Sequence, residues 1–219
     1  MMTVVTLNWA RPDYLVSNLR RYASYRIVDQ VLCFNNGPAL KVGKLPRKCI
    51  LVEASENMGL YPRFALAALA RTEAIFHTDD DICVPETTLD ILLGSWRHAP
   101  GSCHGLHGRV ARPKYQLGDV FGPVEIVLTR AVLCSRRVNN AALSSTSLFD
   151  DIVGVPHGNG EDIILSFAAM AMSRSLNFAY RLDAEDHPVD ADTAIHRRWS
   201  GHIRHRQQIV RRCRKIFKL

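Results

Sequence analysis

The sequence predicts an α/β protein with a mixed, mainly parallel central sheet and helices on both of its faces. Short apolar runs alternate with helical stretches through the first hundred residues, a pattern typical of parallel strands joined by crossover helices. The second half is less regular, which favours a sheet completed by shorter strands. With 219 residues, 47% hydrophobic and 22% charged, the chain is long enough to bury one compact core.

Four apolar runs in the first half have strand character and end at polar or turn-forming residues. They predict strands at Thr3–Asn8, Val28–Phe34, Lys48–Val52 and Ala74–His77. Helices are expected between them, from Pro12 to about Tyr22, over Arg63–Arg71, and from Pro85 and Glu86 to about His98. Since ligands of such sheets lie at the carboxyl ends of the strands, the loops after Asn8, Phe34 and His77 should share one rim.

The second half predicts three further strands and one helix. The strands are expected at Gly105–Val110, Glu125–Thr129 and Phe178–Arg181, and the helix at Ile163–Ser173.

Charge is concentrated at the end of the chain. Residues 196–219 hold nine Lys or Arg and no acid, which leaves 19 basic residues against 21 acidic ones elsewhere. Such a segment favours a polyanion, either a diphosphate, a nucleic acid or an anionic membrane surface, or it forms a solvated helix face. The six cysteines show no C-x-x-C pair, so neither a zinc knuckle nor a disulfide framework is indicated.

Three aspartates, Asp79, Asp80 and Asp81, follow directly on the predicted strand Ala74–His77. Carboxylates this close raise one another's pKa, and a bound divalent cation removes that penalty. Hard oxygen ligands suit Mg²⁺ or Mn²⁺, which can bridge to a diphosphate. A solvated acidic turn is the alternative interpretation.

A second acidic pair, Glu161 and Asp162, follows Gly158 and Gly160 at the start of the predicted helix. The helix dipole alone stabilises acids in a first turn. Alternatively, the glycines let the backbone approach a ligand that both acids face. The basic segment offers guanidinium groups that can bind a diphosphate bidentately.

Several common kinds of site are not indicated by any motif. The chain contains no G-x-x-x-x-G-K-[ST], no G-x-G-x-x-G after a strand, no G-x-S-x-G and no H-E-x-x-H. The sequence therefore does not predict a P-loop, a dinucleotide fold, a serine hydrolase or a zinc protease.

In their order, these segments resemble the exostosin-like (EXT/EXTL-type) glycosyltransferases. That family has the GT-A fold of nucleotide-diphospho-sugar transferases, uses UDP-sugars with Mn²⁺ and retains the anomeric configuration. The matching segments are Thr6-Leu7-Asn8-Trp9-Ala10-Arg11-Pro12-Asp13-Tyr14-Leu15, Phe34-Asn35-Asn36, Asn57 with Arg63, Thr78-Asp79-Asp80-Asp81-Ile82, Gly160-Glu161-Asp162-Ile163 and His202-x-x-x-Arg206.

The resemblance implies a role for each segment. Asp81 would bind the metal, Mn²⁺ or Mg²⁺, and Asp162, Glu161 and Arg206 would be the catalytic residues, with the acids beside the sugar and Arg206 on the diphosphate. It also implies one domain over residues 1–195, with a donor-binding half near 1–100 and an acceptor half near 101–195, completed by a basic helical segment at 196–219. The residues that would hold the UDP-sugar are Thr6, Leu7, Asn8, Arg11, Asn36, Asn57, Arg63, Asp79 and Asp80.

The predicted activity is transfer of GlcNAc, GalNAc or a related hexose from a UDP-sugar. The acceptor stays open between a glycan, a glycolipid and a modified DNA base reached by the basic segment. A non-catalytic nucleic-acid-binding module is a rival, as is a nucleotidyltransferase, although Asn8-Trp9-Ala10-Arg11 lacks the glycine-rich basic loop of the latter. Since no run of eighteen apolar residues and no secretory signal occurs, we expect a cytoplasmic protein without a transmembrane segment, for which peripheral membrane contact is an option.

Overall fold

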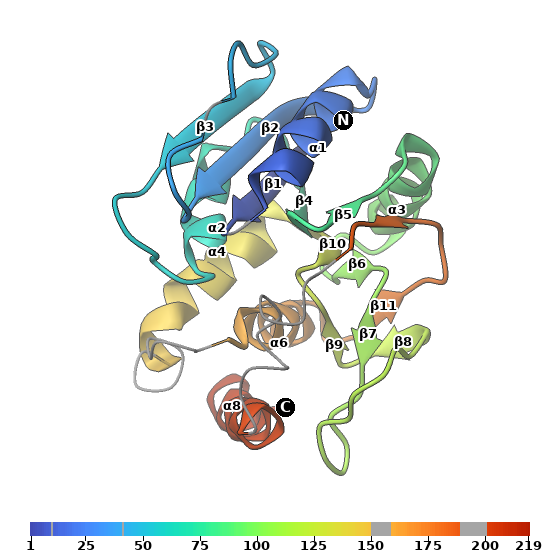
Figure 1. The fold of residues 1–219 in the computed structure, drawn as a ribbon. Helices are drawn as coiled ribbons and strands as arrows, with labels where there is room; N and C mark the ends of the chain where they lie inside the picture. The colour runs from blue at the N-terminus through green and yellow to red at the C-terminus, as the bar shows by residue number, and fades with distance from the viewer. Residues whose placement is uncertain (10, 41, 150–158, 189–200) are drawn as a thin grey trace.

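A computed structural model describes residues 1–9, 11–40, 42–149, 159–188 and 201–219. Eight strands form one mixed sheet in the order β3-β2-β1-β4-β10-β6-β11-β8 (Figure 1). The first four are parallel: β1 (Met2–Asn8), β2 (Val28–Asn35), β3 (Cys49–Glu53) and β4 (Ala74–Asp79). Beyond β4 the sheet continues with β10 (Ala131–Ser135), which is antiparallel to it, and then with β6 (His104–Gly105), β11 (Asn177–Ala179) and β8 (Gly122–Val124). The predicted α/β class with a mixed, mainly parallel sheet is confirmed.

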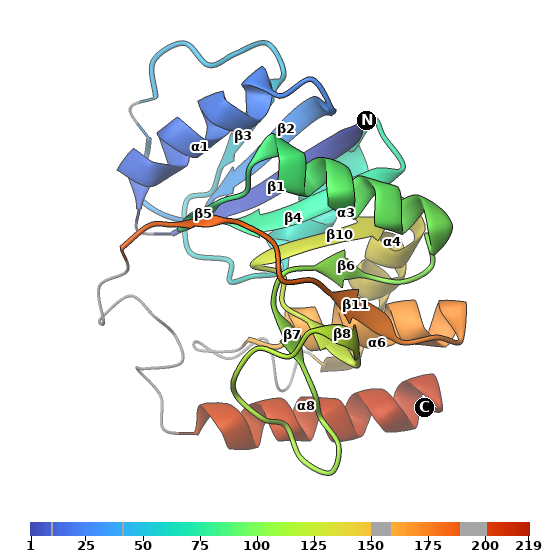
Figure 2. The same ribbon diagram turned by 90° about the vertical axis from the view of Figure 1, so that its right-hand side faces the viewer.

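Each face of the sheet has its own hydrophobic core, because successive side chains of a strand point to opposite faces. Val4 and Phe76 pack with α1 (Pro12–Ser24) and α3 (Glu86–His98) on one face. Val5 and Ile75 pack on the other face with α2 (Pro62–Leu66), α4 (Arg136–Ser145) and α6 (Glu161–Ser173). Figure 2 shows the sheet between these two layers.

The last helix, α8 (His202–Phe217), packs along α6 and forms a further layer (Figure 2). Gly160, at the start of α6, allows this close approach. Its φ of +123° is one that side chains rarely adopt, and a Cβ there would lie 2.3 Å from Cδ1 of Ile209 on α8. None of the helices in the described ranges is long and apolar enough to cross a membrane.

Several predicted elements needed correction. The helix predicted over Arg63–Arg71 is the short α2 followed by a 3₁₀ turn, Ala67–Leu69. The strand predicted over Gly105–Val110 divides into β6 and β7 (Gly108–Arg109), and β7 pairs with β9 (Ile126–Val127) in a separate two-stranded sheet.

The strand divides because it changes partners: β6 pairs with β10 and β11, whereas β7 pairs with β9. Both pieces lie close to neighbouring backbone. A Cβ on Gly105 would lie 2.3 Å from the Ala131 carbonyl oxygen, and one on Gly108 would lie 2.2 Å from that of Val120. The strand predicted over Phe178–Arg181 ends earlier, at Ala179, because the neighbouring strands pair with it only up to that residue, β6 at Gly105 and β8 at Gly122.

Candidate active site

The three aspartates stand at the carboxyl end of β4, on a turn that leads into β5 (Ile82–Cys83). Arg63 donates a hydrogen bond to Asp79 at 2.8 Å. Arg11 donates to Asp80 at 2.6 Å, and the backbone N–H of Trp9 donates to its other oxygen at 3.2 Å. The loop after β1 and the turn after β4 therefore meet, as the parallel topology predicts.

Asp81 lies between two guanidinium groups. Arg11 approaches one carboxylate oxygen at 3.2 Å, and Arg130 donates to the other at 3.3 Å. The backbone of the turn is fixed as well, because Asn18 of α1 donates to the Asp80 carbonyl at 3.2 Å and His187 N–H donates to the Asp81 carbonyl at 2.8 Å. The sequence predicts the turn, but it gives no sign of the Arg130 contact.

Burial, together with the charge of Asp79, raises the pKa of Asp80 to about 6 against the lowering effect of Arg11. Burial and the charge of Asp79 likewise raise the pKa of Asp81, while Arg130 and Arg11 lower it. Both carboxylates are therefore placed where an additional positive charge stabilises their ionised form.

The chemistry of this turn fits a cation that a substrate shares. No group of three or more His, Cys, Asp or Glu in the described part of the chain could hold a metal ion by itself. Mg²⁺-type ions, however, are commonly held by one or two carboxylates together with substrate phosphates and water. Asp81, with Asp79 two residues away, supplies a donor set of that kind.

The loops after β1 and β2 form the neighbouring part of the rim. Asn8 Nδ2 donates to Asn35 at 2.7 Å, whereas Oδ1 of Asn8 is buried without a hydrogen-bond partner among the described residues. Asn36 donates to the Gly59 carbonyl at 2.7 Å, so the loop after β3 also reaches this rim. Asn57 lies on that loop, where it is exposed and accepts from Gly59 N–H at 2.9 Å.

The second acidic pair starts α6 and is almost fully buried. Glu161 accepts from the Thr129 hydroxyl at 2.6 Å and from Gly160 N–H at 3.0 Å. Asp162 pairs with Arg206 at 2.5 Å, and each side chain of this pair is only 5% exposed. Burial and the charge of Asp162 raise the pKa of Glu161.

Arg206 is held in place from several directions. It donates to Asn159 at 3.3 Å, and its guanidinium carbon lies 4.7 Å from the centre of the Tyr115 ring. Burial would lower the pKa of Arg206, but the neighbouring Asp162 raises it above its ordinary value, so the guanidinium stays charged. Arg206 of α8 is therefore a cation placed at the start of α6.

Arg63 connects the two acidic clusters. Its side chain is 2% exposed; one nitrogen binds Asp79, and the other donates to the Thr129 carbonyl at 3.1 Å. The hydroxyl of the same Thr129 binds Glu161. Burial alone would lower the pKa of Arg63, yet the charges of Asp79 and Glu161 raise it. Asp79 and Glu161, which lie in distant parts of the sequence, are thus linked by hydrogen bonds through Arg63 and Thr129.

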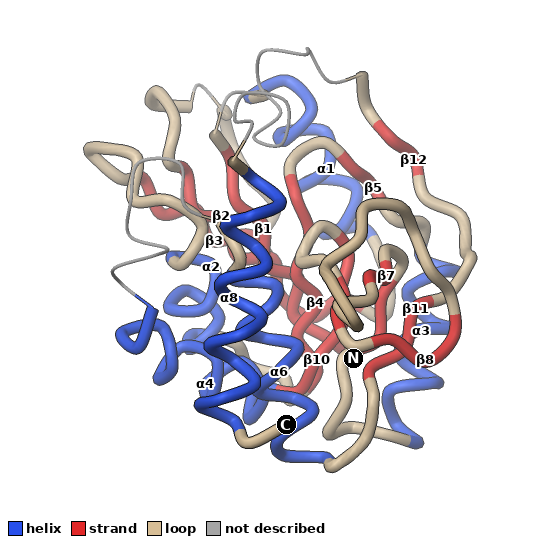
Figure 3. Tube along the Cα trace, turned by 90° about the horizontal axis from the view of Figure 1, so that it is seen from below, coloured by secondary structure: helices blue, strands red, loops and turns tan. Residues whose placement is uncertain are grey.

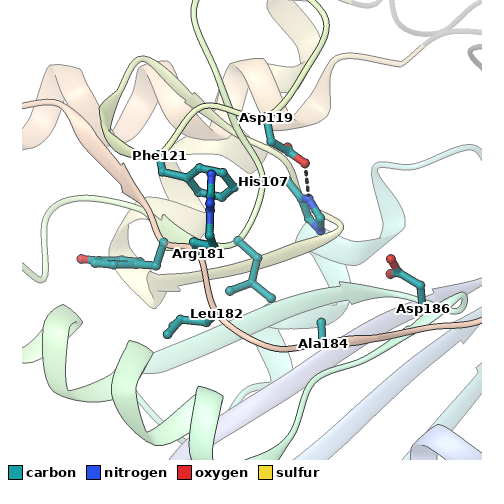
Figure 4. Close-up of a pocket in the computed structure, with 9 residues that line it drawn as sticks. His107, Asp119, Phe121, Arg181, Leu182, Ala184 and Asp186 are labelled. Atoms are coloured by element: carbon teal, nitrogen blue, oxygen red, sulfur yellow. Dashed lines mark hydrogen bonds and ion pairs between the residues drawn. The ribbon is translucent and has the colours of Figure 1, made fainter.

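A pocket of about 150 Å³ lies between the loop after β6 and the segment after β11 (Figure 4). Its lining includes His107, Asp119, Phe121, Arg181 and Asp186, and His107 pairs with Asp119 at 3.2 Å. Arg130 joins the pocket to the aspartates: it pairs with Asp81, donates to Asp186 at 2.7 Å and contacts His107 Nε2 at 3.4 Å. These lining residues form no sequence motif, so sequence reasoning missed them.

Most of the predicted site residues thus lie at one edge of the sheet. In one group Arg11 pairs with Asp80 and Asp81, and Arg63 pairs with Asp79. The other group consists of Glu161, Asp162 and Arg206. Thr6 and Leu7 are buried within β1 beside this rim. Gly158, singled out together with Gly160, lies outside the described residues.

A comparison with models of protein families shows which family the chain belongs to. The model of the glycosyl transferase family 64 domain matches residues 2–219. The chain belongs to this glycosyltransferase family. Its GT-A fold is also that of the solved structure of S. aureus TarS 1–349, to which it is similar with a TM-score of 0.56 at 12% identity.

This similarity covers 85% of the chain and 60% of the TarS chain, so the family 64 chain spans less than two thirds of that structure. No curated protein matches the sequence. Membership of the glycosyl transferase family 64 domain family is thus shown, and DNA binding finds no support in the comparisons.

Proposed function

We propose that this family 64 protein is a metal-dependent, exostosin-like transferase that moves a hexose, GlcNAc, GalNAc or a related sugar, from a UDP-sugar to an acceptor with retention of configuration. The observation that carries the proposal is the convergence of both acidic clusters on Arg63 at the carboxyl edge of the sheet. In this proposal residues 1–195 are the catalytic domain, with the donor half near 1–100, and 196–219 complete the site.

Asp81 would hold Mn²⁺ or Mg²⁺, supported by Asp79 and Asp80. The ion would supply positive charge to the departing diphosphate. Arg11 already neutralises Asp80 and Asp81, and it is placed to turn to the diphosphate when a metal takes over those carboxylates.

The nucleoside would lie along the loops after β1, β2 and β3. The buried, unpartnered Oδ1 of Asn8 supports this position because such an oxygen is stabilised by a hydrogen-bond donor from a ligand. Asn36 and Asn57 would close over the uridine; they lie on the loops after β2 and β3, and both hydrogen-bond the backbone of Gly59. Thr6 and Leu7 would support the loop from within β1.

Asp162 would face the sugar and stabilise the positive charge that develops at its anomeric carbon as the glycosidic bond breaks. The Arg206 ion pair supports this role because it fixes the direction of the Asp162 carboxylate. Glu161, bound to Thr129, would line the same subsite. When the diphosphate departs, Arg206 is the nearest cation on α8 to receive its charge.

The acceptor would enter through the pocket that Arg130 joins to Asp81. His107, Asp119 and Asp186 offer hydrogen-bond partners for hydroxyl groups, and the Phe121 ring offers an apolar face, a combination that suits a sugar. Replacing Asp119 by Asn should raise the acceptor KM and leave the slow release of UDP without acceptor unchanged.

A panel of nucleotide sugars with Mn²⁺, scored by thermal shift and by UDP release, tests the proposed function. We expect a UDP-hexose to stabilise the protein and to release UDP slowly. Asp162→Asn should keep the thermal shift and lose sugar transfer, because it leaves the nucleotide subsite intact. Unimpaired transfer by this variant, or a response to no UDP-sugar, contradicts the assignment.

A further inference from the structure

The cations of α8 and of its C-cap residue, Lys218, fall into two groups. Those directed inward have partners: Arg206 binds Asp162, Arg212 donates to the Leu148 carbonyl, and Arg214 binds Glu125 at 2.9 Å. The others are exposed, and no carboxylate in the described ranges pairs with them. We call this second group the basic stripe; it consists of Arg204, Arg211, Lys215 and Lys218.

The basic stripe runs along one side of the helix. With the exposed Gln208, its members recur at intervals of four and three residues, the spacing that places side chains on one helical face. The opposite face is buried through Ile209, Val210 and Cys213. A helix of 16 residues is about 24 Å long, so the stripe presents a line of uncompensated positive charge over that length.

Exposed aliphatic side chains flank the stripe: Ile203, next to Arg204, lies on one side of it, and Ile216, next to Lys215, lies on the other. Ile203 is 46% exposed and Ile216 is 36% exposed. Beside α8 runs the loop between β7 and β8, as Figure 3 shows from below, tied to the helix by a hydrogen bond from Tyr115 N–H to Gln207 at 2.5 Å. This loop carries Leu117, which is 58% exposed.

We propose that this face docks on a membrane surface that contains anionic lipids, with α8 lying in the plane of the headgroups. The four cations would attract the lipid phosphates, and Ile203 and Leu117, on one flank of the stripe, would enter the boundary with the acyl chains. The aliphatic residues decide between anionic partners, since the phosphates of a nucleic acid give them no apolar surroundings. Arg206 lies on the inner face of the same helix, so docking holds the active site close to the membrane.

The test is sedimentation of the full chain with vesicles of phosphatidylcholine, alone or mixed with phosphatidylglycerol, at about 0.15 M salt. The chain should bind only the mixed vesicles. Each stripe cation near the surface contributes about a fivefold factor in binding, so replacing all four by Gln should weaken it by several hundredfold, on the order of 10²–10³.

A matched control removes the same charge elsewhere, by replacing the exposed Lys44, Arg47, Arg71 and Arg97 with Gln. This variant should keep nearly all binding. Equal losses in the two variants, or no binding of the wild type to mixed vesicles, overturn the proposal. Release of UDP from the donor should be unchanged in the stripe variant, so failure of the docking surface and failure of the proposed function are separable.

A second pair of measurements separates a membrane from a nucleic acid. Replacing Ile203 and Leu117 together by Ser leaves the charge unchanged and should weaken vesicle binding several-fold, about fivefold or more, because apolar insertion is lost. Tight binding to duplex DNA with no effect of these substitutions contradicts membrane docking.

Discussion

The Asp162–Arg206 pair allows a quantitative prediction because both side chains are only 5% exposed and their atoms lie 2.5 Å apart. Arg206→Met removes the cation and leaves the Asp162 carboxylate buried without its partner. Breaking a buried ion pair in this way costs about 3–5 kcal/mol. For a protein of this size, such a loss lowers the melting temperature by roughly 10 °C.

Urea unfolding of a double-mutant cycle measures this effect. Asp162→Asn in the Arg206→Met background removes the buried charge, so the double variant should regain at least 1 kcal/mol, on the order of a third of the loss. Arg204→Met, an exposed position on the same helix, is the control and should change the free energy of unfolding by less than about 0.5 kcal/mol. A loss below about 1 kcal/mol for Arg206→Met, or a double variant no more stable than it, would refute the reasoning.

Three further predictions concern other parts of the molecule. Burial lowers the pKa of His77 to about 3, so folding favours its neutral form, and the free energy of unfolding should fall as pH drops below 6.5. His77→Gln should remove roughly 3 kcal/mol of that loss between pH 6.5 and 4. Urea unfolding at both pH values measures this, and an equal loss of stability in the wild type and in His77→Gln refutes it. Gly160→Ala should lower the free energy of unfolding by about 2 kcal/mol or more, because residue 160 has a positive φ and a Cβ there clashes with Ile209. Adding Ile209→Ala should relieve part of that loss. Thermal melts in which Gly160→Ala equals the wild type contradict this account. Excess EDTA should abolish UDP release while leaving the melting temperature of the donor-free protein within about 1 °C, on the order of measurement error; full activity in EDTA rules out the metal.

The sequence predicts the parallel half of the sheet well because each strand there is an uninterrupted apolar run that ends at a turn signal. It does not predict β10 and α4. The run Ala131-Val132-Leu133-Cys134-Ser135 has strand character, but it follows Thr129-Arg130 without a turn residue and so escapes notice. The short strands β7 and β8 depend on pairing across the sheet, which local pattern does not specify.

For the site, the sequence locates the clusters but not their connections. The aspartates and the Glu161–Asp162 pair are found because several acids stand together next to a regular element. Arg63 is found only through the family resemblance, and Arg130 is not found at all. Each is a single cation whose partners come from distant segments, and only the fold brings them together.

The central claim is that Asp81 and the diphosphate of UDP share one metal ion. Titration calorimetry of UDP binding to the wild type and to Asp81→Asn, with and without Mn²⁺, tests it most directly. If Asp81 and the diphosphate share the ion, Mn²⁺ should strengthen UDP binding to the wild type at least tenfold, about 1.4 kcal/mol, and should have no effect on the variant. Equal strengthening of UDP binding by Mn²⁺ in both proteins would contradict the account.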